Sequence, residues 1–462
     1  MPRSESHRRP PPETWGPARR AAHAIASPIQ RILAVEAASG IVLLVATGAA
    51  LLWANLWPAS YEALWHTPIG LRIAAWSFER PLHFWINDGL MTVFFFVVGL
   101  EIRRELFEGE LATLRKAALP LVAALGGMLA PAGIFALLNV GRAGAAGWAV
   151  PMATDIAFAV GVLTLLGSRV PSALRVLLLG LAVIDDIGAI VVIALFYSAG
   201  IALEGLAMVG LGAGAIWAMR AAGVRSALPY LLPGTVVWAG LLVAGVHPTL
   251  AGVMLGLLTP VRPWFGPSGF AETTQAHLEH LPVDDRDALL SSLDKISEAR
   301  REAVSPVERL IHALHPWVAY VVMPVFAVAN AGVVVGGAEL TGDARWLFAG
   351  IVAGLVLGKP LGITLTALLA SRLGIAVRAD DVTRRGVLLV GVVGGIGFTM
   401  SLFIAQLAFP NGPLLLTAKL AILIGSGVAI VGGTLFGLAS RHLRVSSAPA
   451  DPLRASPVDD AT

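Results

Sequence analysis

The stretch LLGLAVIDDIGAIVVIALF, residues 178–196, carries two adjacent aspartates, Asp185 and Asp186, near the middle of an otherwise apolar run. A helix needs roughly 20 predominantly apolar residues to cross the hydrocarbon core of a bilayer, so this run is long enough to be a transmembrane helix. A charged side chain at the bilayer centre costs at least about 2.5 kcal/mol, and such residues therefore usually face a bundle interior and serve a function. The stretch predicts a membrane protein with a functional site at mid-membrane.

The rest of the chain has the same apolar character. Of its 462 residues, 56% are hydrophobic and 14% are charged, whereas a soluble domain carries about 25% charged residues. We therefore expect an all-α polytopic membrane protein with about twelve transmembrane helices. The expected spans are residues 31–54, 81–104, 118–138, 148–166, 173–198, 203–220, 228–243, 247–259, 313–334, 346–370, 385–408 and 413–439.

The charged residues indicate how the chain is oriented and divided. Arginine and lysine gather at the N-terminus and after the even-numbered spans, and they are few after the odd-numbered spans. The positive-inside rule therefore predicts that both termini are cytoplasmic. Residues 1–27 and 441–462 are polar and rich in proline, and we expect disordered cytoplasmic tails around a single transmembrane domain, 28–440. Within this domain, residues 260–312 are expected to form a cytoplasmic loop that contains a surface helix.

The composition also excludes several kinds of site. The chain has no cysteine, so disulfides and thiolate metal sites are impossible. The basic residues are scattered over short loops and offer no continuous face for a nucleic acid. We expect no cofactor.

Two of the expected spans contain residues that break helices. Pro151 lies in the fourth span, shortly before Thr154 and Asp155, and proline removes a backbone donor and clashes with the preceding turn. The eleventh span concentrates four glycines at mid-depth, which serve either close helix packing or a helix break. Each candidate is the middle member of a three-span unit, the third to fifth and the tenth to twelfth spans. This placement predicts inverted-topology repeats with a site between the two interrupted helices.

The ionisable residues inside the spans suggest what such a site does. Asp155 and Lys359, in the tenth span, join Asp185 and Asp186 at similar depth. A purely structural ion pair with Lys359 needs one carboxylate, and three are present. Hard cations prefer oxygen ligands, and adjacent carboxylates at low dielectric resist double ionisation, so the same oxygens hold either protons or a cation. This competition predicts a cation/proton exchanger, which is electrogenic if more than one proton moves per monovalent cation.

Other classes of protein fit the residues less well. A sodium-coupled symporter of an organic anion is the main alternative, but it needs a larger polar pocket than these few groups indicate. An intramembrane aspartyl protease needs two aspartates that face each other from different helices, and here they are sequence neighbours. A channel filter has no need of titratable ligands.

Seven stretches of the chain form a recognisable series. They are INDGLMTVFFFVVGLEIRREL, VPMATDIAFAVGVLTLLGSRVP, LAVIDDIGAI, VHPTLAG, LHPWVAYVVMPVFAVANAGV, GKPLGI and GGIGFTMSLF. In this order they resemble the NhaA-type family of bacterial sodium/proton antiporters over most of residues 28–440. This family is itself a known example of inverted-repeat transporters, so the two predictions are not independent. The resemblance implies a secondary active transporter and not an enzyme, in the bacterial inner membrane, with Na⁺, Li⁺ and H⁺ as substrates.

Matching positions carry roles over to this chain. The resemblance implies that Asp185 and Asp186 form the cation and proton site, with Asp186 as the principal ligand of Na⁺ or Li⁺. It also implies that Asp155 and Thr154 belong to an interrupted fourth span that crosses an interrupted eleventh. Lys359 corresponds to the essential lysine of the tenth span.

The resemblance further implies regulation by pH and pairing of two protomers. The candidates for pH regulation are Glu101, Arg104, Glu105, His247, His312 and His315. Ile311 stands where some members carry a glutamate, and this departure affects the expected pH profile. Asp88 is a candidate site residue on the periplasmic side. Strand-like alternation between the first two spans predicts a small periplasmic hairpin, through which two chains would form a homodimer.

Overall fold

The computed structural model describes residues 36–440, except for residues 74–75, 199, 201, 225, 264, 280–284, 335, 337–339, 377–381 and 411. Within this part of the chain, helices dominate and the strands form one two-stranded sheet. The expected tails, 1–27 and 441–462, lie outside the described residues, so their disorder stays a prediction.

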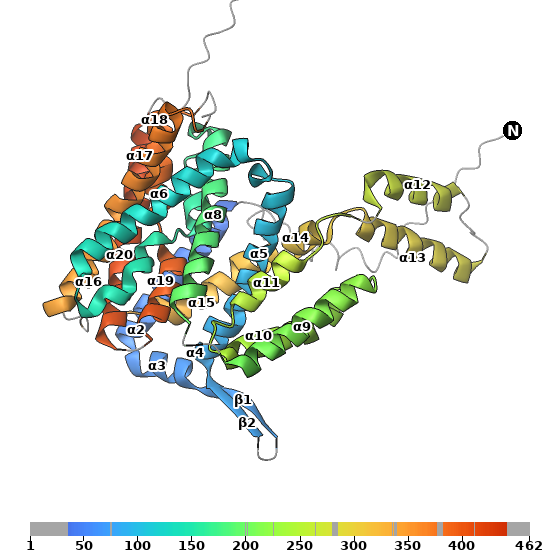
Figure 1. Cartoon of the computed structure of the whole chain (residues 1–462), viewed down its shortest axis with the longest axis horizontal. Coiled ribbons are helices and arrows are strands. Elements are labelled where there is room, and N and C mark those ends of the chain that lie inside the picture. The colour runs from blue at the N-terminus through green and yellow to red at the C-terminus, as the bar shows by residue number, and fades with distance from the viewer. Residues whose placement is uncertain are drawn as a thin grey trace, which may run out of the picture.

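The helices form a long bundle from which two smaller units extend, a strand hairpin and a helical hairpin (Figure 1). Within the first half of the chain they are α2 (Glu36–Leu56), α3 (Pro58–His66), α4 (Leu82–Phe84), η1 (Trp85–Leu90), α5 (Met91–Phe107), η2 (Glu110–Ala112), α6 (Leu114–Asn139), η3 (Ala143–Met152), α7 (Ile156–Leu165), η4 (Gly167–Arg169), α8 (Ser172–Phe196) and α9 (Leu203–Ala221). After these come η5 (Leu228–Tyr230), α10 (Leu231–Ala244), α11 (Leu250–Leu258), α12 (Gly266–Glu279), α13 (Arg286–Glu302), α14 (Pro306–Trp317), η6 (Val318–Val322), α15 (Met323–Asn330), α16 (Gly342–Ala353), η7 (Gly354–Gly358), α17 (Lys359–Arg372), α18 (Arg384–Gly394), α19 (Phe398–Ala408) and α20 (Pro413–Ala439).

Seven helices in the described residues are long and apolar enough to cross a membrane, and nine are if each of two bent pairs counts as one span. This confirms a polytopic α-helical membrane protein. The expected spans at 203–220, 228–243 and 247–259 correspond to α9, α10 and α11, which are not among the nine. The nine residues of α11 extend only about 14 Å at 1.5 Å per residue, less than the apolar thickness of a bilayer. The count of twelve spans therefore stays a prediction.

The two bent pairs lie where the sequence predicted breaks. η3 and α7 are separated at residues 153–155, α18 and α19 at residues 395–397, and each pair is bent by 45°. In the first pair Pro151, which has no backbone N–H to donate, lies inside η3 just before the break. In the second, Gly395 lies so close to Leu355 of a neighbouring element that an added Cβ would approach the Leu355 carbonyl oxygen to 2.4 Å. Glycine thus lets the broken backbone pack directly against its neighbour.

The core of the bundle lies between the helices that surround these breaks. Its fully buried apolar side chains come from α6, α8, α17, α18 and α19, for example Phe135, Leu178, Ile363, Val390 and Phe403. A dense apolar interior of this kind excludes water, so any polar group inside it needs a partner. The broken helices supply such partners through their free backbone groups.

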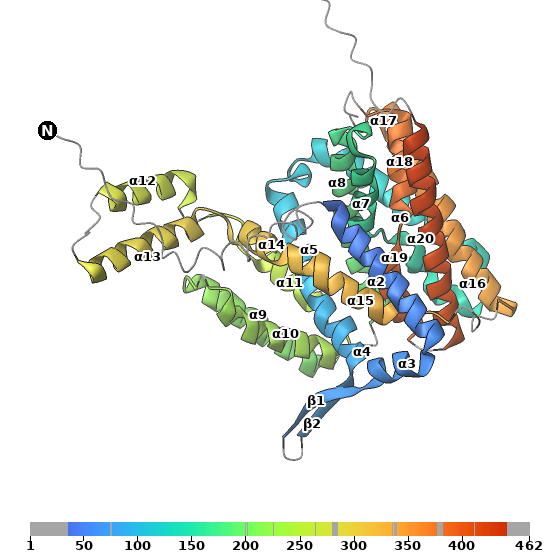
Figure 2. The same ribbon diagram turned by 180° about the vertical axis from the view of Figure 1, so that it is seen from behind.

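The hairpin predicted between the first two spans is present. β1 (Pro68–Ile73) pairs antiparallel with β2 (Trp76–Pro81), with Ile69 opposite Arg80. The pair projects from the bundle beyond α3 and α4 in both views (Figures 1 and 2). The loop at 260–312 forms two helices, α12 and α13, instead of one, and they extend sideways from the bundle (Figures 1 and 2).

Candidate functional site

The aspartate doublet lies in α8, and its first member, Asp185, is hydrogen-bonded to Lys359. Lys359 Nζ donates a hydrogen bond to Asp185 Oδ2 over 2.7 Å and to Thr154 Oγ1 over 2.8 Å. All three side chains are at most 1% exposed. Two opposite charges that are removed from water together stabilise each other, whereas either one alone would be costly. The structure therefore brings Asp185, Lys359 and Thr154 together.

The two broken helices meet at backbone groups that their breaks leave free. Thr154 Oγ1 donates to the carbonyl oxygen of Gly394 over 2.9 Å, and the Asp155 amide donates to the carbonyl of Ile396 over 2.7 Å. Further along, Ser401 Oγ donates to the Val150 carbonyl over 2.7 Å. Each break thus satisfies unpaired backbone groups of the other.

Asp155 joins the starts of two helices with one carboxylate. Its Oδ1 accepts from the amide of Phe158 over 3.2 Å and so caps α7. Its Oδ2 accepts from the Thr399 amide over 3.1 Å and from the Thr399 hydroxyl. Thr399 lies in the first turn of α19. A negative charge between two helix N-termini is favoured by both helix dipoles. The sequence had indicated an interrupted eleventh span but not Thr399 itself.

The backbone before Lys359 is unusual and places it at the site. Residues 354–358 form a π-helical turn, η7, directly before α17 begins at Lys359. An added Cβ at Gly358 would lie 2.6 Å from Pro131 Cα, and one at Gly354 would lie 2.6 Å from Pro151 Cβ. Single π-turns inside helices frequently occur at functional sites because they change the direction of the following side chains.

Asp186 is 2% exposed and interacts electrostatically with Asp185, Glu101 and Asp155. The helix turns about 100° between neighbouring residues, so its side chain leaves α8 in a different direction from that of Asp185. Asp185 Oδ1 is buried and has no hydrogen-bond partner among the described residues, and an oxygen in this state is a suitable ligand for a cation. In the described part of the chain, no three His, Asp or Glu side chains group closely enough to hold a metal ion alone. Backbone and hydroxyl oxygens would have to complete such a ligand set.

Three of the pH candidates lie together on α5. Glu101 interacts with Arg104 and Glu105 as well as with Asp186, and Arg104 Nη2 lies 3.6 Å from Glu105 Oε1. Glu101, Arg104 and Glu105 therefore form a series of charged side chains that runs from the partly exposed end of α5 towards Asp186. The i, i+3 and i+4 spacing of Glu101, Arg104 and Glu105 places them on one helical face, but spacing alone does not reveal the electrostatic interaction of Glu101 with Asp186.

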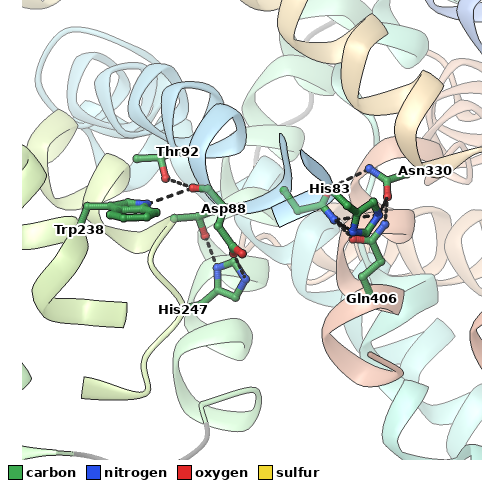
Figure 3. Close-up of polar contacts among 9 residues, drawn as sticks. His83, Asp88, Thr92, Trp238, His247, Asn330 and Gln406 are labelled. Carbon is green, nitrogen blue, oxygen red and sulfur yellow. Dashed lines mark hydrogen bonds and ion pairs between the residues drawn. The ribbon is translucent and has the colours of Figure 1, made fainter. Parts of the chain in front are cut away.

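Asp88 and His247, which the sequence suggested separately, form one pair. His247 Nε2 lies 3.1 Å from Asp88 Oδ1, and His247 Nδ1 lies 2.7 Å from Thr249 Oγ1. Trp238 Nε1 donates to the Asp88 carbonyl over 3.1 Å, as does the Thr92 hydroxyl over 2.5 Å (Figure 3). This pair lies at the end of the bundle near the hairpin, because Asp88 follows β2 by only a few residues.

The remaining two histidines lie on the exposed side of α14. His312 and His315 are exposed, whereas Val307 and Ile311 on the same helix are buried. The buried side packs with Leu100 of α5, one residue before Glu101. The structure thus places the two histidines on a helix that contacts α5 and does not place them among the buried carboxylates.

A second buried polar group was missed by sequence reasoning. His83, Asn87, Asn330 and Gln406 form a hydrogen-bonded network between three helices (Figure 3). Asn330 and Gln406 are single amides inside apolar runs, in FAVANAGV and FIAQLAF. A search of the spans for neutral polar residues, as well as for charges, would have found them.

This fold and this site together define a class of protein: a multi-pass membrane transporter whose buried carboxylates and lysine lie where two broken helices meet. The family model described as Na⁺/H⁺ antiporter 1 matches residues 30–436. The chain belongs to this family.

Curated relatives share the sequence over nearly its full length. The chain is 57% identical to "Na(+)/H(+) antiporter NhaA 2" of Sorangium cellulosum over 427 residues, which cover 91% of each protein. It is 53% identical to the protein of the same name from Myxococcus xanthus, over 98% of this chain and 96% of the relative. It is 47% identical to "Na(+)/H(+) antiporter NhaA" of Bordetella petrii, over 91% of this chain and 92% of the relative.

Proposed function

We propose that this protein exchanges sodium ions for protons across the inner membrane of a bacterium by alternating access. The observation that carries the proposal is the buried doublet of α8, with Asp185 bonded to Lys359 beside the meeting point of two broken helices. The relatives named as Na⁺/H⁺ antiporters support it. We extend the proposal to Li⁺, which has the same charge and the same preference for oxygen ligands.

The residues of the site divide into ligands and supporting groups. Asp186 is the principal ligand of Na⁺ or Li⁺, and the unpartnered Oδ1 of Asp185 contributes a second carboxylate oxygen. Asp155 and Thr154 keep the two helix breaks in contact, since each bonds to residues of the second break. Protons and the cation compete for the same carboxylates, because two adjacent buried carboxylates resist double ionisation.

Lys359 makes the exchange electrogenic. A cation bound between Asp186 and Asp185 competes with the Lys359 ammonium for Asp185, which lies 2.7 Å from it. The lysine then gives up a proton in addition to the one that Asp186 loses. More than one proton therefore moves for each sodium ion, and each cycle transfers net charge across the membrane.

The proposed arrangement in the membrane has twelve spans and inverted repeats. The third to fifth and the tenth to twelfth spans form the two repeats, each with its bent pair in the middle. The basic residues after even-numbered spans support cytoplasmic termini and a cytoplasmic loop at 260–312. The α9, α10 and α11 helices complete the count, although α11 alone is too short to cross.

We further propose that the transport rate depends on cytoplasmic pH through two groups of residues. Glu101, Arg104 and Glu105 connect the end of α5 to Asp186, and His312 and His315 lie on the adjacent α14. The third candidate, on the hairpin side, is the pair of His247 and Asp88, in which His247 Nε2 lies 3.1 Å from Asp88 Oδ1. Two protomers pair through the β1–β2 hairpin on the periplasmic side.

An exchange assay in everted membrane vesicles tests the function and the site together. Added sodium should release protons and restore the fluorescence of a quenched pH dye, and Asp186→Asn should abolish this signal because its amide cannot exchange a proton. Asp294→Asn is the matched control, since Asp294 lies exposed on α13. An imposed membrane potential should change the rate of the intact protein.

Three results would contradict the proposal in separate parts. Normal exchange by Asp186→Asn refutes the assigned ligand, and a rate that ignores membrane potential refutes electrogenic exchange. Absence of sodium-driven proton movement by the intact, membrane-inserted protein refutes exchange itself. Sodium uptake that requires an organic anion would instead identify the symporter alternative.

A further inference from the structure

The side chains of Asn87, Asn330 and Gln406 form a closed ring of hydrogen bonds, and Figure 3 labels Asn330 and Gln406 beside His83. Asn87 Nδ2 donates to Gln406 Oε1 over 2.5 Å, Gln406 Nε2 donates to Asn330 Oδ1, and Asn330 Nδ2 donates to Asn87 Oδ1 over 2.8 Å. Each amide is therefore both donor and acceptor, and the bond from Asn330 Nδ2 to the Phe326 carbonyl sets the direction of the ring.

His83 closes one side of the ring. Its Nε2 lies 2.9 Å from Asn330 Oδ1 and its Nδ1 lies 3.1 Å from Asn87 Nδ2. A neutral imidazole with its hydrogen on Nε2 satisfies both contacts, because Nε2 then donates and Nδ1 accepts. Asn330 Nδ2 also donates to the Phe326 carbonyl over 3.0 Å. Each amide and the imidazole therefore have hydrogen-bond partners within this network.

The ring joins three elements at one end of the molecule. Asn87 belongs to the π-turn η1, Asn330 to the end of α15 and Gln406 to α19. Asn330 is fully buried and Asn87 is 8% exposed. β2 ends at Pro81, two residues before His83, so the ring lies on the hairpin side of the bundle.

α19 connects the ring directly to the buried carboxylates. Thr399 binds Asp155 in the first turn of α19, and Gln406 follows seven residues later, about 10 Å along the helix at 1.5 Å per residue. Phe403 lies between them, and its ring centroid is 5.3 Å from that of Phe95 and 6.3 Å from that of Phe326. Going along α19 away from the site, Phe403 first contacts Phe95 of α5 and Phe326 of α15. Gln406 then bonds to Asn87 of η1, which precedes α5, and to Asn330 of α15.

We propose that the amide ring of Asn87, Asn330 and Gln406 is a latch that keeps α19 closed against η1 and α15, and that it must open when the site opens to the hairpin side. The proposal rests on the alternating access proposed above. Burying an amide has a desolvation cost that an apolar side chain of similar size would not have. A latch explains why amides are nevertheless present at these three positions. Apolar contacts have no fixed direction and allow α19 to shift against its neighbours, whereas a closed ring of hydrogen bonds is formed in one position of α19. The three amides are positioning residues, since they act on the ions through α19.

Thiol labelling tests whether the ring controls access. The chain has no cysteine, so Ala405→Cys, beside Gln406 and fully buried, is a single reporter. A charged, membrane-impermeant thiol reagent is applied in turn to each side of sealed vesicles. Adding Gln406→Leu should raise the labelling rate from the hairpin side about tenfold, the factor that corresponds to 1.4 kcal/mol of lost stabilisation of the closed state.

The labelling needs a matched control. Gln275→Leu is the same substitution on α12, where Gln275 bonds to Glu279 of its own helix over 2.8 Å, and it should leave the labelling of Ala405→Cys unchanged. An equal increase from both sides would indicate general loosening of the fold. An unchanged rate with Gln406→Leu would mean that the ring does not hold α19. Either result overturns the latch.

A reversible cross-link tests whether opening is needed for exchange. Asn330→Cys/Gln406→Cys is bridged by a short bifunctional methanethiosulfonate, and sodium-driven proton release should stop and then return when a reductant cleaves the bridge. Recovery shows that the protein stayed folded, and each single cysteine should be insensitive to the reagent. A bridged protein that exchanges as fast as the reduced one overturns the proposal. Failure of the proposed function is distinct, because the intact chain would then release no protons on addition of sodium.

Discussion

Asp155 connects the two interrupted helices through one carboxylate. Its two oxygens accept three hydrogen bonds that the structure assigns, from Phe158, from the Thr399 amide and from the Thr399 hydroxyl. The charge lies at the N-termini of α7 and α19, where the partial positive charge of each helix favours it. A helix break in a membrane is therefore stabilised here by a charge that would otherwise be unfavourable.

We predict that Thr399→Val weakens the site without removing a ligand. Valine has nearly the shape of threonine but cannot donate to Asp155, and a hydrogen bond to a charged group contributes about 1.5–3 kcal/mol. The free energy of unfolding should fall by an amount in this range, and exchange in vesicles should slow. Thr434→Val is the control, because the Thr434 hydroxyl donates to the Ile430 carbonyl of its own helix. Equal effects of the two substitutions would show that the Thr399–Asp155 bond is unimportant.

Tyr61 allows a prediction about alkaline pH outside the spans. Burial raises the pKa of Tyr61 to about 12, against an opposing backbone hydrogen bond from Gly332, and its hydroxyl donates to the Val328 carbonyl over 2.8 Å. A tyrosine in the unfolded chain ionises near pH 10. The folded state holds the phenolic proton more tightly, so this stabilisation is complete below pH 10 and is lost as pH rises towards 12.

Tyr61→Phe should therefore reduce the alkaline loss of stability. Between pH 9 and pH 11 the intact protein should lose about 1 kcal/mol more than the variant. The thermal unfolding midpoint in detergent at both pH values measures this difference. The lost hydrogen bond to Val328 lowers the stability of the variant at both pH values. The quantity to compare is therefore the loss of stability between pH 9 and pH 11 in each protein. Parallel curves would mean that Tyr61 ionises equally in the folded and unfolded chain.

At the scale of elements, short irregular turns set the direction of the functional side chains. The π-turn η7 directly precedes Lys359, and the π-turn η1 contains both Asn87 and Asp88. Asn87 contacts α15 and α19, whereas Asp88 contacts His247 in the connection between α10 and α11. One widened turn thus presents two neighbouring residues to two different parts of the bundle.

We predict that Gly358→Ala displaces Lys359. Its new Cβ would lie 2.6 Å from Pro131 Cα in α6, and backbone on both sides leaves little room for adjustment. Overpacking of this kind costs about 1–3 kcal/mol. The unfolding midpoint should fall, and exchange should fall further because Lys359 moves away from Asp185. Gly427→Ala in α20 has no heavy atom within 4 Å of its new Cβ and should change neither measurement.

At the scale of the whole molecule, every buried site residue belongs to one chain. Asp185, Lys359, Thr154 and Asp155 bond to groups of the same protomer. The β1–β2 hairpin projects from the bundle beyond α3 and α4 (Figure 2). The pairing of two chains that we propose for the hairpin therefore involves a part of the molecule separate from the buried site.

We predict that removal of the hairpin gives an active monomer. The Leu82 amide donates to the Thr67 carbonyl over 2.9 Å, so two glycines can replace residues 69–80 with little change to the bundle. Light scattering of the purified protein should change from dimer to monomer, and vesicle exchange should persist. Arg72→Ala is the control, because the exposed Arg72–Glu79 pair contributes little. A variant that remains dimeric would assign the pairing to another surface.

Much of the fold and of the carboxylate site could be predicted from single residues. A charge, a proline or a glycine cluster inside an apolar span is costly enough to need a reason, and Asp155, the doublet and Lys359 were found in this way. The amide network was missed because a neutral polar side chain is a much weaker signal. The prediction of the spans has a similar limit at α11. Hydropathy identifies an apolar segment, but it does not show how many of its residues form the helix.

The sequence by itself determined the class of protein, the two broken helices and the ionisable residues of the site, because these depend on local composition and on the cost of burying charge. Only the tertiary structure decided which groups meet. It paired Lys359 with Asp185, placed Glu101 where it interacts electrostatically with Asp186, and joined Asp88 to His247. The physical reason is that neighbouring helix residues point about 100° apart, and a side chain's partner depends on which distant helix packs against that direction.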